Sequence, residues 1–248
     1  MPSPTADRLI LASQRSALFA LPALLIGVFA LHFRGAADFF DFHTSYAPAP
    51  PEQVVASLVA AGNPGPLIHD PHVIAYLALP LFLLCASGLY ALGRHARPVA
   101  SLVAMAIAVV GVIYLGGLFG MWAAFYRGLG DVDPRHLEGA TATFAAMSAP
   151  NGAFLLTTTL AKLAFVGLAL QALALLGTRL VPRWSPLLVA GGCVLFLAFW
   201  DLDNWMLLGA VLMLAGFLPM RAALSSPQLH QRVAPVVKRV AEAAAKPS

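Results

Sequence analysis

Charged side chains are scarce in this sequence. Of its 248 residues only 10% are Asp, Glu, Lys or Arg, whereas 60% are hydrophobic, and the mean hydropathy is +0.80. A soluble domain carries about a quarter charged residues, so this composition excludes a soluble enzyme, a nucleic-acid-binding protein and a disordered chain. It predicts an integral membrane protein, whose net charge of +4 has to be divided between the two sides of the bilayer.

Cysteine is equally rare. The two cysteines, Cys85 and Cys193, both lie within apolar runs, which excludes a disulfide framework, a CxxC motif and a thiolate metal site. Phosphate-binding glycine loops, GxSxG and HExxH patterns are also missing from the sequence. We therefore expect a non-enzymatic protein more than an enzyme.

Long apolar segments are what the sequence has in abundance. About 20 apolar residues cross a hydrocarbon core of about 30 Å, and six segments approach that length: residues 17–33, 73–93, 99–126, 153–178, 186–200 and 205–219. The last two are short and are separated by a turn that contains Asp201 and Asp203, which favours a tight hairpin over one long span. The sequence therefore predicts an all-α, polytopic membrane protein with six transmembrane helices in one domain, residues 1–224.

The charges predict the orientation of these helices. One side holds both termini and the loops 94–98 and 179–185, and it carries eleven Lys and Arg residues against two acidic ones. The opposite side carries three basic residues against nine acidic ones. Because Lys and Arg accumulate on the cytoplasmic side, both termini are expected inside a bacterial cytoplasmic (inner) membrane. The first segment ends in His32-Phe33-Arg34 without a small-residue cleavage site, so we expect an uncleaved helix there.

Three further segments are predicted to be helices outside the bilayer core. Residues 51–61 and 137–147 belong to the two long outer loops and are expected to be interfacial helices. The tail, residues 225–248, has valines on one face and Arg232, Lys238 and Arg239 on the other. This pattern is typical of a basic amphipathic helix that binds anionic lipid, with a partner-binding helix as the alternative.

Lys162 is the candidate centre of a ligand site. It lies ten residues into the fourth segment and so near the middle of the membrane, where a lysine costs at least about 2.5–3.5 kcal/mol and requires a partner or water. Thr158 and Thr159 lie one turn away, and Asp201 or Asp203 is a potential counter-ion if the hairpin dips inward. The alternative is a lysine whose long side chain reaches the outer interface.

A second candidate site uses histidines predicted at the outer face. His69, Asp70 and His72 precede the second segment, and His32 lies at the outer end of the first. Imidazole and carboxylate ligands suit zinc or copper, so these four residues form a candidate metal site. The alternatives are pH-responsive histidines and ordinary interfacial polar residues.

A resemblance to a known family covers residues 9–221. The order of helices and loops is similar to that of bacterial six-helix membrane proteins grouped as a domain of unknown function. Residues 180–189, with Pro182-Arg183, resemble the "PRxxG" turn between helices four and five of those proteins, although Ser185-Pro186 departs from the pattern and its glycine is missing. The resemblance implies the six-helix layout and no activity or site residue.

Three functions remain open at this point. The first is a protein that binds, passes or senses a small solute through an outward-facing polar pocket around Lys162. The second is a membrane-embedded metal-dependent enzyme or redox protein that uses the outer histidines. The third is a structural or assembly subunit of a membrane complex, with a membrane-protein partner or a second copy of this chain as its partner; no nucleic-acid partner is expected.

Overall fold

The computed structural model describes residues 4–31, 39–41, 49–62, 71–149, 151–200 and 203–226. Every regular element in this part of the chain is a helix, which confirms the all-α prediction. The helices are α1 (Pro4–Ala30), α3 (Pro51–Ala61), α4 (Pro71–Leu77), α5 (Leu79–Gly93), α6 (Pro98–Gly130), η2 (Pro134–His136), α7 (Leu137–Ser148), α8 (Ala153–Ala161), α9 (Leu163–Ala174), α10 (Trp184–Ala198) and α11 (Asp203–Ala223).

Four of the described helical segments are long and apolar enough to cross a membrane. They are most of α1, all of α6, the joined pair α8–α9 and α11. The pair α4–α5 passes the same test as a fifth, bent span, while α10, with 15 residues, is shorter. Helices of this length and composition are those of a membrane protein.

The bends and breaks have local causes. The chain bends by 42° between α4 and α5, where Pro80 lacks the N–H that would bond to the carbonyl of Tyr76. Pro22, in contrast, lies inside the continuous helix α1. The predicted fourth segment is also not one unbroken helix, because it is interrupted at Lys162 and its second part ends at Ala174.

Close helix crossings at glycine hold the bundle together. At Gly111 of α6 a Cβ atom would overlap the backbone of Leu163 and Ala164, and at Gly167 of α9 it would overlap the backbone of Ala108. The backbones of α6 and α9 therefore touch, as small residues allow in membrane bundles. Helices α10 and α11 cross in the same way, and α11 packs in turn on α1.

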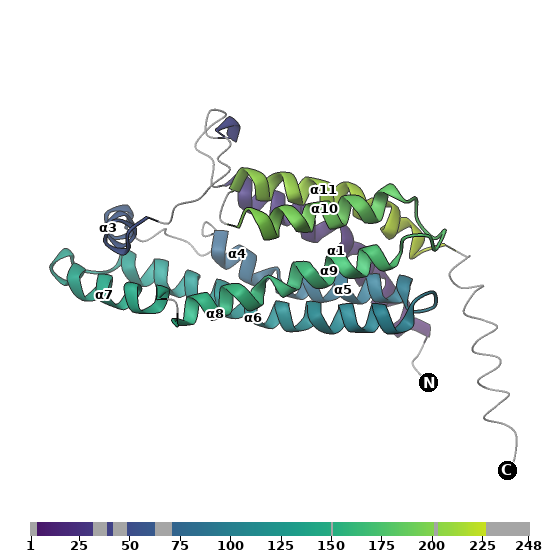
Figure 1. The fold of residues 1–248 in the computed structure, drawn as a ribbon, viewed down its shortest axis with the longest axis horizontal. Coiled ribbons are helices and arrows are strands. Elements are labelled where there is room, and N and C mark those ends of the chain that lie inside the picture. Colours follow the sequence, from purple (N-terminus) through teal and green to yellow (C-terminus); the bar gives the residue numbers. More distant parts are fainter. Residues whose placement is uncertain are drawn as a thin grey trace, which may run out of the picture.

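The two ends of the bundle carry different segments (Figure 1). The start of α1, the α5–α6 turn, the α9–α10 turn and the end of α11 lie at one end. Helices α3 and α7 lie at the other end and pack against each other. Segments 51–61 and 137–147 are helical as predicted, whereas most of the predicted basic tail, residues 227–248, lies outside the described residues.

Helix α6 is much longer than its neighbours. Its 33 residues correspond to about 50 Å at 1.5 Å per residue, and its far end extends past the tip of the α10–α11 hairpin (Figure 1). The bundle therefore has a step at this end: α6, α7 and α3 on one side, and the hairpin tip on the other. The cavity described next lies at this step.

Candidate functional site

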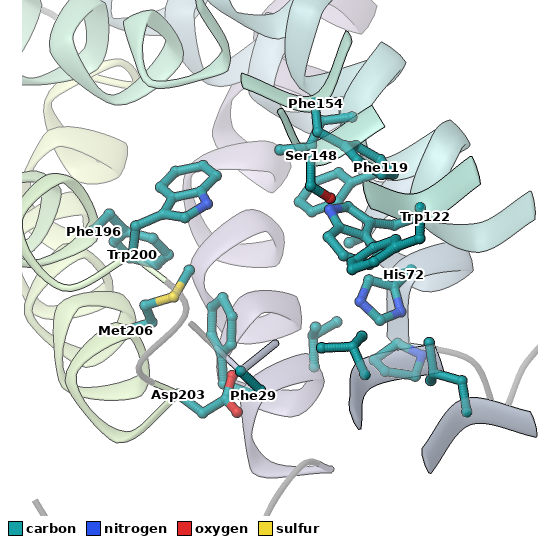
Figure 2. A pocket seen from close by; sticks show the side chains of 18 of the residues that line it. Phe29, His72, Phe119, Trp122, Ser148, Phe154, Phe196, Trp200, Asp203 and Met206 are labelled. Atoms are coloured by element: carbon teal, nitrogen blue, oxygen red, sulfur yellow. The ribbon is translucent and has the colours of Figure 1, made fainter. Parts of the chain in front are cut away.

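A cavity of about 880 Å³ lies between the α10–α11 hairpin tip and the neighbouring ends of α4, α6 and α8. This volume is within the range of small-molecule sites, about 300–1,000 Å³. Helix α3 and the residues before it contribute Pro50, Val54 and Leu58 to the lining. Two groups of aromatic side chains form the remaining sides (Figure 2).

The first wall is formed by Phe29, Phe82, Phe165, Phe196 and Trp200. Phe165 stacks on Phe196, with ring centroids 4.4 Å apart, and meets Trp200 edge-on at 6.1 Å. Phe82 meets Phe165 at 5.7 Å and Phe29 meets Phe196 at 5.6 Å. Helices α1, α5, α9 and α10 are thus joined by offset and edge-to-face contacts of the kind aromatic rings prefer.

The second wall is formed by His72, Trp122, Phe144 and Phe154. Trp122 of α6 stacks on Phe154 of α8 at 4.8 Å and on the His72 ring of α4 at 6.2 Å. Phe144 of α7 contacts Phe154 at 6.1 Å and is supported from behind by Phe125, at 5.3 Å. In Figure 2 this wall faces Trp200, Phe196 and Met206 across the cavity.

Polar groups are few in the cavity lining. They include the imidazole of His72, the hydroxyl of Ser148 and the carboxylate of Asp203. Asp203 lies in the first turn of α11, where the helix dipole stabilises a negative charge. Among the described lining residues, Asp203 is the one that carries a formal charge at neutral pH. The lining is thus mainly apolar, whereas the sequence predicts a polar pocket.

Lys162 lies beside this cavity and is not part of its lining. The residue sits between α8 and α9, and its Nζ lies 5.5 Å from the centroid of the Trp200 ring. A lysine at that distance from an indole ring is attracted to the ring's negative face. Trp200 therefore contacts both the cavity and the ammonium of Lys162.

The other predicted ligand residues are placed as follows. Thr158 is half-buried and Thr159 is exposed, and neither lines the cavity. Asp203 does line it, while Asp201 lies outside the described residues. In the described part of the chain the ammonium of Lys162 is held by an aromatic ring, and no carboxylate pairs with it.

The predicted metal site cannot be assembled from the described residues. His72 lines the cavity and stacks on Trp122, but His32, His69 and Asp70 lie outside the described residues. Within the described ranges no group of three His, Cys, Asp or Glu side chains is close enough to hold a metal ion. Zinc or copper binding stays a prediction.

The aromatic walls are the feature that sequence reasoning missed. Five of these side chains lie within about two turns of the end of an apolar segment that the sequence predicts to face outward: Phe29, Trp122, Phe154, Phe196 and Trp200. That shared position is a signal in the sequence, since it places the rings at one depth.

Comparisons with protein families, characterised proteins and solved structures gave no match for this chain.

Proposed function

We propose that the chain is a multi-pass protein of a bacterial inner membrane that crosses the bilayer six times, with both termini in the cytoplasm. The six spans are α1, α4–α5, α6, α8–α9, α10 and α11. The positions of the basic loops support this topology. The basic loops 94–98 and 179–185 lie at the same end of the bundle as the start of α1 and the end of α11 (Figure 1), and Lys and Arg accumulate on the cytoplasmic side.

The function proposed for this protein is to bind a small lipophilic solute in the cavity at the outer end of the bundle and to pass or sense it. The cavity of about 880 Å³ between two aromatic walls is the observation that carries the proposal. Apolar pockets with a few polar groups are the usual form of small-molecule sites. The solute is thus expected to be mainly apolar, in place of the polar solute that Lys162 alone would favour.

In this proposal Lys162 does not bind the ligand itself but lies next to the ligand site. Its ammonium lies over Trp200, which is a wall of the cavity. A ligand that moves Trp200 also changes the environment of Lys162 and of the junction between α8 and α9. This contact is a route by which occupancy of the cavity reaches the middle of the bundle.

Binding of pyrene, an uncharged apolar fluorophore, tests the proposal. Trp122 and Trp200 line the cavity, so bound pyrene is expected to accept excitation energy from tryptophan in protein reconstituted into phosphatidylcholine nanodiscs. Ala75→Phe and Ala61→Phe place a ring in the cavity and are expected to weaken binding about tenfold, since overfilling costs about 1–3 kcal/mol.

Ala124→Phe is the matched control for these two variants. Ala124 is exposed on α6 and does not line the cavity, so the same substitution there is expected to leave pyrene binding unchanged. Partition of pyrene into lipid is common to all the samples and cancels in this comparison. Equal energy transfer in the control and in both cavity variants would rule out binding in the cavity.

A further inference from the structure

Arg15 is a cation without a counter-charge near the middle of α1. It is half-buried, and its Nε–H is fully covered and has no hydrogen-bond partner among the described residues. No Asp or Glu lies three or four positions away along the helix, where an ion pair would form. A half-buried guanidinium needs a hydrogen-bond acceptor, and the described part of the chain does not supply one.

Arg221 of α11 is a second cation on the same surface. Helices α1 and α11 pack on each other, and the guanidinium carbon of Arg221 lies 5.8 Å from the centroid of the Phe19 ring. Phe19 follows Arg15 by one turn on the same face of α1. The two guanidinium groups therefore flank one aromatic ring, and we call Arg15 and Arg221 the arginine pair.

The charges around the arginine pair have one sign. Among the described residues at this end of the bundle (Figure 1), Asp7 is the one acidic side chain, and it lies eight residues, about 12 Å along α1, from Arg15. Residues 227–248 carry four Lys or Arg against one Glu, so they add positive charge. The helix dipole accounts for Arg221, in the last turn of α11, but not for Arg15. This surface therefore favours an anion.

The apolar neighbours of the arginine pair point to an anion that carries hydrocarbon chains. Phe19 and Leu218 are 46% and 47% exposed, and each lies about one turn from its arginine toward the middle of its helix. In a bilayer crossed by α1 and α11, the guanidinium groups then lie nearer the headgroups and the two apolar side chains nearer the acyl chains. A phospholipid covers both parts of this surface, whereas a soluble anion covers only the charged part.

We propose that the arginine pair binds the headgroup of an anionic phospholipid, with an acyl chain lying on Phe19 and Leu218. Guanidinium groups recognise phosphate oxygens with charge-assisted hydrogen bonds, so one headgroup phosphate accepts donors from both helices. The bound lipid thereby links α1 to α11. Binding here is independent of the cavity and requires only that α1 and α11 cross the bilayer, as they do in the proposed topology.

Native mass spectrometry of the full chain in detergent, with equal amounts of added phosphatidylglycerol and phosphatidylcholine, provides the test. The two lipids share acyl chains and a phosphodiester, but only phosphatidylglycerol has a net negative charge. The unmodified chain is expected to bind it more than about tenfold more tightly. Arg15→Gln and Arg221→Gln should each weaken phosphatidylglycerol binding about fivefold and leave phosphatidylcholine binding unchanged. The double variant should bind the two lipids about equally.

Four control variants separate the arginine pair from other causes. Arg15→Lys and Arg221→Lys keep the positive charge and should keep the preference for phosphatidylglycerol. Arg94→Gln removes an exposed arginine from the α5–α6 turn at the same end of the bundle and should leave binding nearly unchanged. Ala75→Phe fills the cavity and should also leave it unchanged. Thermal unfolding verifies that each variant is folded.

Four results would overturn the proposal. The first is equal binding of the two lipids by the unmodified chain, and the second is undiminished phosphatidylglycerol binding in both glutamine variants. An equal loss in Arg94→Gln would mean that the whole basic end attracts the lipid, and full competition by inorganic phosphate at the lipid's concentration would make the site one for a free anion. Pyrene binding is measured separately, so the cavity proposal can stand where this one fails.

Discussion

Asp133 and Arg135 form an exposed ion pair at the start of η2. The Asp133 carboxylate accepts hydrogen bonds from the Arg135 guanidinium, the shortest at 2.6 Å, and from its backbone N–H at 2.9 Å. These bonds hold the pKa of Asp133 below its usual value of 3.8, with the guanidinium as the larger cause. The stabilisation is therefore present above that value and is lost as the pH falls through the lowered pKa.

Arg135→Gln is expected to raise the pKa of Asp133 toward 3.8, since it removes the guanidinium and keeps the backbone donor. The carboxyl carbon resonance of Asp133, followed by NMR across an acid titration, measures this change. Stability at neutral pH should hardly change, because an exposed pair contributes little. An unchanged pKa in the variant would show that the guanidinium bonds do not form in solution.

Individual site residues were predictable where their burial was costly. The depth of Lys162 in an apolar segment was enough to predict that its ammonium needs a partner. The identity of that partner could not be predicted, because Trp200 lies 38 positions further along the chain and meets Lys162 only after α9 and α10 have packed together. Asp203 was predicted as a ligand residue for a polar pocket, and the structure places it in an apolar one.

Helices α10 and α11 pack so closely that one of two adjacent glycines has no room for a side chain. A Cβ at Gly192 would lie 2.5 Å from the carbonyl oxygen of Gly209, and one at Gly191 would meet nothing within 4 Å. Gly192→Ala is expected to lower the free energy of unfolding by about 1–3 kcal/mol. Gly191→Ala should be neutral or stabilising by up to about 1 kcal/mol, because alanine favours helix more than glycine does.

Thermal unfolding of the two alanine variants in the same detergent measures this difference. The pair is well matched, since both substitutions are one methyl group in neighbouring positions of the same helix. Equal unfolding temperatures would mean that α10 and α11 lie further apart than in this structure.

The helices themselves were predictable to different degrees. Residues 51–61 form α3 as predicted, because Pro51 starts the helix and Gly62, with φ +72°, ends it. Periodicity and length located the other segments to within a few residues at most ends, although α1 begins well before residue 17. The break at Lys162 was not predictable from the segment alone, since it lies where the backbone of α6 touches α9 at Gly111.

The topology can be tested with the native cysteines in place. Cys85 and Cys193 are fully buried and free, so the unmodified chain should not react with a membrane-impermeant maleimide. Ser57→Cys, exposed on α3, is expected to react in intact spheroplasts. Ala96→Cys, exposed in the α5–α6 turn, should react only after permeabilisation. A reversed pattern would invert the proposed orientation.

The charges in the sequence predicted which loops lie at the same end of the bundle, but nothing in the sequence predicted the cavity. Sorting Lys and Arg by side grouped the same loops that Figure 1 places at one end of the bundle. The cavity depends on side chains from α1 and from each α-helix between α3 and α11 meeting near the hairpin tip, and on α6 extending beyond that tip. Contacts between helices that are distant in the sequence leave no pattern from which the cavity could be predicted. The length and hydropathy of each helix, in contrast, can be read from the sequence directly.

The short hairpin also has a consequence for the lipid around it. The 15 residues of α10 span about 22 Å, whereas the hydrocarbon core is about 30 Å thick. Hydrophobic mismatch of this size is relieved by tilting or by local thinning of the bilayer. In the proposed topology, such thinning beside α10 would draw the outer headgroups toward Trp200 and Asp203, and an amphiphile dissolved in the outer leaflet would then lie level with the cavity.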